Sequence, residues 1–379
     1  MSPLEQALEA KLRERQATGN LRNLTLPGKG TDFFSNDYLG ISATGLLHKL
    51  VADSFLMATG STGSRLISGN SAAFETLEAT IAAFHKAEAA LIFNSGYDAN
   101  TGLISAIADR HTTILYDELC HASIIDGIRL SLCANKYRFA HNNLDALREK
   151  LEQQAAKTGA VLVIVESVYS MDGDMAPLAA IVTLCKQYGA QLIVDEAHAT
   201  GVFGAHGEGL VNALGLEDDV FARVHTFGKA MGCHGAVVVG SQLLRNYLIN
   251  FARSFIYTTA LPPHSVQLIA GAYQHLASPT FTNQPLHDLI AYFRQRISEN
   301  NMQGWVDSTS PIQALVIGDN DKSRTLASRL QQQNIHVKAI LRPTVPLGSE
   351  RLRICLHTFN SREEVDELLG VCKKRNIGL

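Results

Sequence analysis

The chain has 379 residues, of which 46% are hydrophobic and 18% charged, and its 33 Lys and Arg residues nearly balance its 36 Asp and Glu residues. This composition excludes a disordered chain, and the lack of a basic excess argues against nucleic acid as a partner. At roughly 100 to 200 residues per domain, the length predicts two or three domains.

Six cysteines are scattered through the sequence without a C-x-x-C pair. This spacing disfavours a structural metal site or a disulfide framework and fits reduced thiols in a cytoplasmic protein. Residues 1–16 place charged and apolar side chains at helical spacing, which predicts a helix, and they lack the apolar stretch of a signal peptide. No run approaches the ~18 apolar residues of a membrane span, so we expect no membrane segment.

Between residues 89 and 240, short apolar runs alternate with helical stretches. This pattern predicts an α/β fold with a mostly parallel central sheet and helices on both faces. Ligands bind at the carboxyl ends of the strands in such sheets, where the segments beginning at Asn94, Asp117, Glu166 and Asp195 should lie together. The apolar runs are residues 90–93, 113–116, 161–165, 192–194 and 235–240.

After residue 258 the sequence changes to long helical segments, followed by apolar runs at 311–317, 336–340 and 351–356. We expect a large domain at residues 46–275 and a smaller α+β domain at residues 276–379. Residues 1–45 hold too few apolar side chains for a core of their own, so we expect them to pack on the small domain.

The motif Asp195-Glu-Ala-His198 resembles the second motif of a nucleotide-driven helicase, but the phosphate-binding loop G-x-x-x-x-G-K-[ST] of such proteins is not in the sequence. Taken alone, Asp195 is also compatible with a simple helix cap after a buried strand. A second motif decides between these readings. Lys229, in Thr226-Phe-Gly-Lys229, is set among apolar and glycine residues, where loss of water lowers the pKa of an amine and makes it nucleophilic.

A carboxylate and a nucleophilic lysine are what pyridoxal 5'-phosphate (PLP) requires of a protein. The carboxylate keeps the ring nitrogen protonated, and the lysine holds the aldehyde as a Schiff base and moves a proton. A strand-to-helix junction at Ser95-Gly96-Tyr97 offers free N–H groups to the phosphate, and Thr226 adds a hydroxyl. Most single histidines serve structure, yet His121 lies at the same sheet edge and can stack on the ring, while Ser170 and His198 can contact its phenolic oxygen.

Six segments, in order, resemble the α-oxoamine synthase family, which are fold-type I PLP enzymes, and the resemblance covers nearly the whole chain. It implies that Gly96, Tyr97, His121, Ser170, Asp195, His198 and Thr226 bind the cofactor, with Lys229 as the Schiff-base lysine; His121, Asp195, His198 and Lys229 are the catalytic set. It also assigns Arg22, Asn36, Thr344 and Arg353 to substrate, and Arg353 suits a carboxylate. The segments are residues 34–40, 60–69, 117–123, 170–174, 195–201 and 226–229.

Within this family, residues 138–142, 311–320 and 343–346 resemble the branch that condenses L-alanine with a pimeloyl thioester, carried by CoA or by acyl carrier protein, in biotin biosynthesis. Two positions depart from that branch: Arg342 stands one place later than the usual arginine, and Arg65 resembles the branches that use glycine or serine. A sister enzyme using glycine or serine is therefore the first alternative, and an aminotransferase or lyase on the same fold is the second. A regulatory PLP-binding domain is disfavoured, because Lys229 is present and no DNA-binding module is appended.

The resemblance also implies a homodimer with shared active sites. Thr258-Thr259, beside Pro262-Pro263, resembles the segment that reaches the cofactor phosphate of the neighbouring subunit in this fold type, so Thr259 is expected to bind cofactor across the interface.

Overall fold

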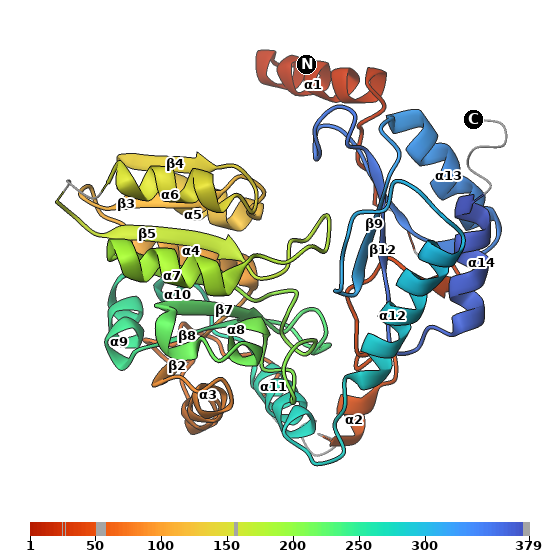
Figure 1. Cartoon of the computed structure of the whole chain (residues 1–379). Coiled ribbons are helices and arrows are strands. Elements are labelled where there is room, and N and C mark those ends of the chain that lie inside the picture. The colour runs from red at the N-terminus through yellow and green to blue at the C-terminus, as the bar shows by residue number, and fades with distance from the viewer. Residues whose placement is uncertain (25, 27, 51–57, 155–157, 374–379) are drawn as a thin grey trace.

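The computed structural model describes residues 1–24, 26, 28–50, 58–154 and 158–373. Figure 1 shows two bodies, a larger one built on a seven-stranded sheet and a smaller one built on a three-stranded sheet. Among the described residues, no helix is long and apolar enough to cross a membrane.

The large sheet has the order β2-β8-β7-β6-β5-β3-β4. Only β8 runs antiparallel to its neighbours, so the predicted mostly parallel sheet is confirmed. The central strands are buried because helices cover both faces, although β7 also carries the buried polar side chains Arg223 and His225. The strands are β2 (Ala89–Phe93), β3 (Thr113–Asp117), β4 (Asn135–Phe139), β5 (Val161–Glu166), β6 (Gln191–Asp195), β7 (Ala222–Thr226) and β8 (Ala236–Gly240).

Two layers of helices enclose this sheet. One core contains Leu103, Ile124 and Leu248, from α4 (Gly96–Ile107), α5 (Ala122–Leu130) and α9 (Gln242–Phe251), together with α10 (Arg253–Ile256). Fully burying one such aliphatic side chain contributes about 1.5–3 kcal/mol. The remaining cores are formed with α3 (Ala72–Phe84), α6 (Leu144–Glu152), α7 (Leu178–Tyr188), α8 (Leu210–Ala213) and α11 (Pro263–Leu276).

The small body is an antiparallel sheet of order β11-β12-β9 packed on three helices. Phe33, from the N-terminal segment, is buried in the same core as Leu352 and Leu286. The strands are β9 (Ile312–Val316), β11 (Lys338–Ile340) and β12 (Arg351–Cys355), and the helices are α12 (Gln284–Glu299), α13 (Asn320–Gln332) and α14 (Arg362–Lys373). The division of the chain at residues 45 and 275 stays a prediction.

The N-terminal helix α1 (Pro3–Ala17) confirms the helix predicted for residues 1–16 and buries none of its side chains. It begins at a capping box in which Ser2 and Glu5 satisfy each other's backbone N–H groups. The chain then passes through β1 (Thr31–Asp32), and α2 (Leu46–Leu50) follows further along.

Two sequence expectations for strands were wrong. The single strand expected at 336–340 is two pieces, because β10 (Ile335–His336) pairs with β1 whereas β11 pairs with β12. The N-terminal segment pairs with β10 through β1, and the local sequence pattern does not predict this pairing. The edge strand β4 was missed because Lys136, Tyr137 and Arg138 are exposed, and polar side chains of this kind protect sheet edges.

Candidate active site

Three carboxylates end neighbouring strands at one edge of the large sheet: Asp117 on β3, Glu166 on β5 and Asp195 on β6. Glu166 and Asp195 lie directly opposite each other in the register. Burial and the charge of Asp195 raise the pKa of Glu166 to about 8, so Glu166 keeps its proton at neutral pH. At this edge Glu166 is therefore a neutral neighbour of Asp195 at neutral pH.

Lys229 follows β7 and reaches the same edge, where its Nζ lies 2.8 Å from His198 Nε2. Burial lowers the pKa of Lys229 to about 8, against the opposing attraction of Asp195 and Glu166. An amine with this pKa is unprotonated in a sizeable fraction of molecules at neutral pH and is therefore a nucleophile.

His198 is buried and links Lys229 to the N-terminal segment. Its Nδ1 lies 2.8 Å from the Tyr38 hydroxyl, which donates to Asn36 Oδ1 at 3.0 Å. Burial and the charge of Lys229 hold the pKa of His198 well below its usual value, so the ring is neutral. Since the Tyr38 proton goes to Asn36, His198 donates from Nδ1 and accepts from Lys229 at Nε2.

The hydrogen-bond chain continues into the small body through Arg353 on β12. Its guanidinium donates to Asn36 Oδ1 at 2.9 Å and to the carbonyl of Ser170 at 2.6 Å. Asn36 thus accepts from Tyr38 and Arg353 at one oxygen. The structure brings together five of the predicted residues: Asn36, Ser170, His198, Lys229 and Arg353.

Asp195 and His121 are joined through two side chains that the sequence reasoning did not assign. The amide of Asn100 donates to Asp195 Oδ2 at 2.7 Å and to Ser123 Oγ at 3.0 Å. Ser123 Oγ in turn lies 2.8 Å from His121 Nδ1. Burial lowers the pKa of His121 despite the nearby Asp195. The site thus pairs a buried carboxylate with a neutral, flat aromatic ring.

The first turn of α4 lies beside the end of β7. A Cβ at Gly96 would lie 3.5 Å from Thr226 Oγ1, an ordinary van der Waals distance, so the two residues are close neighbours. The N–H groups of Gly96 and Tyr97 have no acceptor within the helix and are available to an anion. Thr259 lies close by, since its carbonyl accepts from Asn94 Nδ2 at 2.8 Å.

Two predicted substrate residues are not brought into this network. Arg22 and Thr344 are exposed, and no described interaction joins either of them to Lys229 or Arg353. Ser170 contacts Arg353 through its carbonyl oxygen, not through the hydroxyl that was expected to contact the cofactor. Arg65 is buried in an ion pair with Glu78 at 2.8 Å and stacks on Phe74, so it stabilises the large body.

The segment 170–174 connects the two bodies beside the site. Asp172 forms an ion pair with Arg351 on β12, and the carbonyl of Gly173 accepts from Ser308 Oγ at 2.8 Å. At its other end Asp174 holds His141 Nε2 at 2.6 Å, while His141 Nδ1 lies 2.9 Å from Asp117. We name residues 170–174 the strap.

His141 gives the strap a pH dependence. Although burial opposes the charge, the two carboxylates raise the pKa of His141 from 6.5 to about 9. A pKa raised on folding stabilises the protein fully below 6.5, and this stabilisation is lost as pH rises through about 9. Its size is on the order of 3 kcal/mol at 1.36 kcal/mol per pKa unit.

We expect His141→Gln to lower the free energy of unfolding at pH 6 and to change it little at pH 10. Urea denaturation of both proteins across this range measures the difference. His48→Gln, at an exposed position of α2, is the control and should leave the pH profile unchanged. A wild-type profile parallel to that of His141→Gln would contradict the assignment.

The chain matches the family model described as aminotransferase class I and II over residues 29–371. It is 44% identical to 8-amino-7-oxononanoate synthase of Emericella nidulans, over 97% of this chain and 94% of that protein. With 8-amino-7-oxononanoate synthase of Methylobacillus flagellatus it shares 38% identity, over 98% and 96% of the two chains. The chain belongs to the 8-amino-7-oxononanoate synthase family.

Solved structures agree with this family. The crystal structure of 8-amino-7-oxononanoate synthase from Francisella tularensis superposes with a TM-score of 0.78 at 28% identity, over 91% of this chain and 97% of that one. Serine palmitoyltransferase from S. paucimobilis, with bound PLP, gives a TM-score of 0.88 at 25% identity, over 99% and 98%. The fold is that of the fold-type I PLP transferases, as the sequence predicts.

The residues at the sheet edge fit PLP. A buried carboxylate, Asp195, suits a protonated ring nitrogen, and the first turn of α4 with Thr226 suits a phosphate. Lys229 lies within reach of the same space, because its amine contacts His198. Among the described residues, no group of three or more His, Cys, Asp or Glu side chains is arranged to hold a metal ion.

Proposed function

We propose that the protein condenses L-alanine with a pimeloyl thioester, releasing CO2 and the free thiol and forming 8-amino-7-oxononanoate, with PLP as cofactor. The hydrogen-bond chain from Lys229 through His198, Tyr38 and Asn36 to Arg353 carries this proposal. This chain connects a buried amine with a buried guanidinium, which is a group suited to binding a carboxylate. The family named above supports the choice of substrates.

Each side chain has a defined task in this reaction. Arg353 binds the alanine carboxylate and fixes the orientation of its Cα–H bond toward Lys229. Lys229 removes the Cα proton and later returns one, and His198 holds the amine in place by accepting its N–H. PLP, when bound, supplies a protonated ring that withdraws electrons from the amino-acid Cα. Asp195 provides the negative charge beside the ring nitrogen.

Glu166 adds little negative charge beside Asp195 at neutral pH. With a pKa of about 8 it remains neutral at pH 7, and it accepts the backbone N–H of His121. It thereby orients the loop that carries His121 without competing with Asp195 for the ring proton.

Release of free thiol from pimeloyl-CoA, with each amino acid offered in turn, tests the function. We expect thiol release with L-alanine and much slower release with glycine or serine. Fast release with glycine or serine alone would assign the chain to a sister branch. Consumption of the amino acid without thiol release would indicate an aminotransferase.

The alternative that uses glycine or serine rests on Arg65 and on the similarity to serine palmitoyltransferase. In this chain Arg65 is occupied by Glu78 and Asn70 and has no described contact with Lys229 or Arg353. Its side chain therefore supports the fold of the large body rather than the choice of amino acid, and the alanine-using reaction is favoured.

We also propose that the working unit is a cytoplasmic homodimer with shared active sites. Thr259 is exposed beside Asn94 at the phosphate end of the site, where a second subunit can reach it, and closed homodimers are the commonest oligomers. Six free cysteines fit a reducing compartment.

We expect a mixture of Lys229→Ala and Thr259→Ala chains to recover part of the wild-type turnover, because one site of each heterodimer combines an intact Lys229 with an intact Thr259. Chain exchange and a strong defect of Thr259→Ala alone are the required controls. Full activity of a monomer in light scattering would contradict shared sites.

A further inference from the structure

Asn100, Ser123 and His121 form a short series of hydrogen bonds that begins at Asp195, and we name these three residues the relay. The amide nitrogen of Asn100, on α4, lies 2.7 Å from Asp195 Oδ2 and 3.0 Å from Ser123 Oγ. Ser123 is in the first turn of α5, and its hydroxyl and backbone nitrogen lie 2.8 Å and 3.2 Å from His121 Nδ1. Asn100, Ser123 and Asp195 are buried, so water has little access to these bonds.

The direction of each hydrogen bond in the relay follows from the group at its start. A carboxylate accepts hydrogen bonds, so the Asn100 amide presents its N–H groups and not its oxygen to Asp195. The second N–H of that amide donates to Ser123 Oγ, which leaves the hydroxyl hydrogen of Ser123 free to donate to His121 Nδ1. The backbone N–H of Ser123 donates to the same nitrogen. His121 Nδ1 therefore carries no hydrogen, and the hydrogen of the neutral ring lies on Nε2.

The Nε2 atom of His121 is left available to a ligand. His121 is exposed at the sheet edge, and no described residue forms a hydrogen bond with this nitrogen. A neutral ring with its hydrogen on Nε2 can donate to a substrate oxygen but cannot take up a proton at that atom. Protonation of Nδ1 would set a new N–H group against the two donors of Ser123. The relay therefore favours a ring that donates a hydrogen bond and does not titrate.

We propose that Asn100 and Ser123 are positioning residues that hold His121 as a neutral Nε2–H donor throughout turnover, so that His121 orients the substrate and exchanges no proton. The tautomer follows from the relay alone, whereas its consequence for turnover rests on the proposed function. Lys229 then moves the Cα proton without a second base beside it. Because the relay begins at Asp195, the carboxylate assigned to the ring nitrogen also polarises the donors that hold His121.

Ionisable groups on several elements face His121. Loss of water lowers the pKa of the ring, Asp195 on β6 and Asp126 on α5 raise it, and Lys229 lowers it. Glu166 on β5 accepts the backbone N–H of His121 and is neutral at pH 7. These charges oppose one another, so the hydrogen bonds of the ring also affect its pKa. Donors to Nδ1 stabilise the neutral ring and lower the pKa further.

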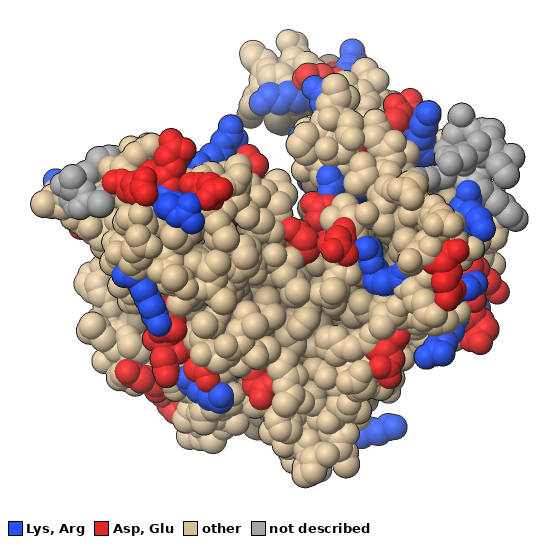
Figure 2. All heavy atoms as spheres, viewed as in Figure 1, with Lys and Arg blue, Asp and Glu red and all other residues tan. Residues whose placement is uncertain are grey.

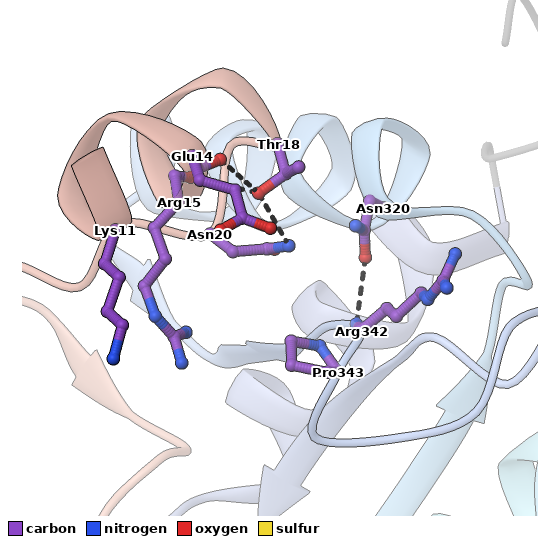
Figure 3. Close-up of a pocket in the computed structure, with 8 residues that line it drawn as sticks. All are labelled: Lys11, Glu14, Arg15, Thr18, Asn20, Asn320, Arg342 and Pro343. Carbon is purple, nitrogen blue, oxygen red and sulfur yellow. Dashed lines mark hydrogen bonds between the residues drawn. The ribbon is translucent and has the colours of Figure 1, made fainter. Parts of the chain in front are cut away.

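Distant charges do not act on the relay through any described contact. Figure 2 shows basic and acidic side chains interspersed over the face in view, so neither sign dominates there. The cavity in Figure 3, between α1 and the start of α13, is lined by Lys11, Arg15 and Arg342. No described interaction joins these cations to His121. The protonation of His121 therefore depends on its neighbours at the sheet edge and on the donors of Ser123.

Nitrogen NMR of the holoenzyme, labelled with ¹⁵N in its histidine rings, tests the tautomer without an activity assay. We expect wild-type His121 to be protonated at Nε2 and unprotonated at Nδ1, with its signals assigned by their loss in His121→Asn. In Ser123→Ala the pKa of His121 should rise, because a donor to the neutral ring is lost. Ser105→Ala, which removes a hydroxyl that donates to Thr101 in its own helix, is the matched control. Wild-type His121 protonated at Nδ1, or an unchanged pKa in Ser123→Ala, would overturn the proposal.

The pH profile of thiol release tests the role of the relay in turnover. Relative to wild type, kcat of Ser123→Ala should fall about two- to tenfold as the pH is lowered from 8 to 6, which is the effect of losing one hydrogen bond. The same loss at every pH would indicate a structural defect and would overturn the role in turnover. An Nε2–H tautomer in a protein that releases no thiol would support the relay and refute the proposed function. Thiol release with alanine by a protein whose His121 is protonated at Nδ1 would refute the relay alone.

Discussion

Lys229→Ala is expected to abolish turnover, with a loss of at least about four orders of magnitude. Lys229 is the amine that would move the Cα proton, and general acid–base groups alone contribute about 10²- to 10⁴-fold. Its lowered pKa and its contact with His198 support its proposed role as the reactive amine. Steady-state assays of thiol release measure the loss.

Borohydride reduction of the holoenzyme gives an independent measurement of the same assignment. Mass spectrometry of the digested wild-type protein should find the cofactor fixed on Lys229 and absent from the variant. Lys86→Ala is the matched control, since Lys86 forms an exposed ion pair with Glu217 and should leave labelling and turnover intact. Cofactor fixed on another lysine would refute the assignment.

Asp195→Asn is expected to slow exchange of the alanine Cα proton by about 10²- to 10⁴-fold. Removing one partner of a buried charge pair costs about 3–5 kcal/mol, and each 1.36 kcal/mol is tenfold in rate. Asn keeps the size of the side chain but not its charge. Proton NMR in deuterated buffer follows the exchange without requiring the thioester.

The neighbouring carboxyl provides a matched control for this experiment. Glu166→Gln removes a group that already carries its proton below a pKa of about 8, so exchange at pH 7 should fall far less than in Asp195→Asn. Nearly equal losses in the two variants would contradict the different charge states of Asp195 and Glu166.

The sequence predicted those strands of the large sheet that are buried on both faces. The runs that became β5 and β6 consist mostly of Val, Ile and Leu, which is the composition of strands covered by helices on both faces. The edge strand β4 consists mostly of polar residues, and the apolar pattern therefore did not predict it. Pairing between β1 and β10 joins residues about 300 positions apart along the sequence. A local pattern of apolar residues cannot predict such a long-range contact.

The sequence likewise predicted some residues of the candidate site and not others. Lys229, Asp195 and His198 could be assigned because their motifs occur together and resemble those of a PLP-enzyme family, whereas each residue alone has a common structural use. Asn100 and Tyr38 could not, although Tyr38 lies in a segment that resembles the family, because their roles depend on contacts with Asp195 and His198 across the fold. The raised pKa of Glu166 likewise arises from burial beside Asp195, which the sequence does not display.

The contacts of the strap couple the unfolding of the two bodies. Its residues hold Arg351, Arg353 and Ser308 on one side and His141 on the other. Separating the two bodies would leave several of these buried polar groups without partners, at about 1–3 kcal/mol for each. Unfolding of the small body before the large one is therefore unfavourable in free energy. Heating should give a single cooperative transition in calorimetry, and the two bodies behave as one thermodynamic unit although they have separate cores.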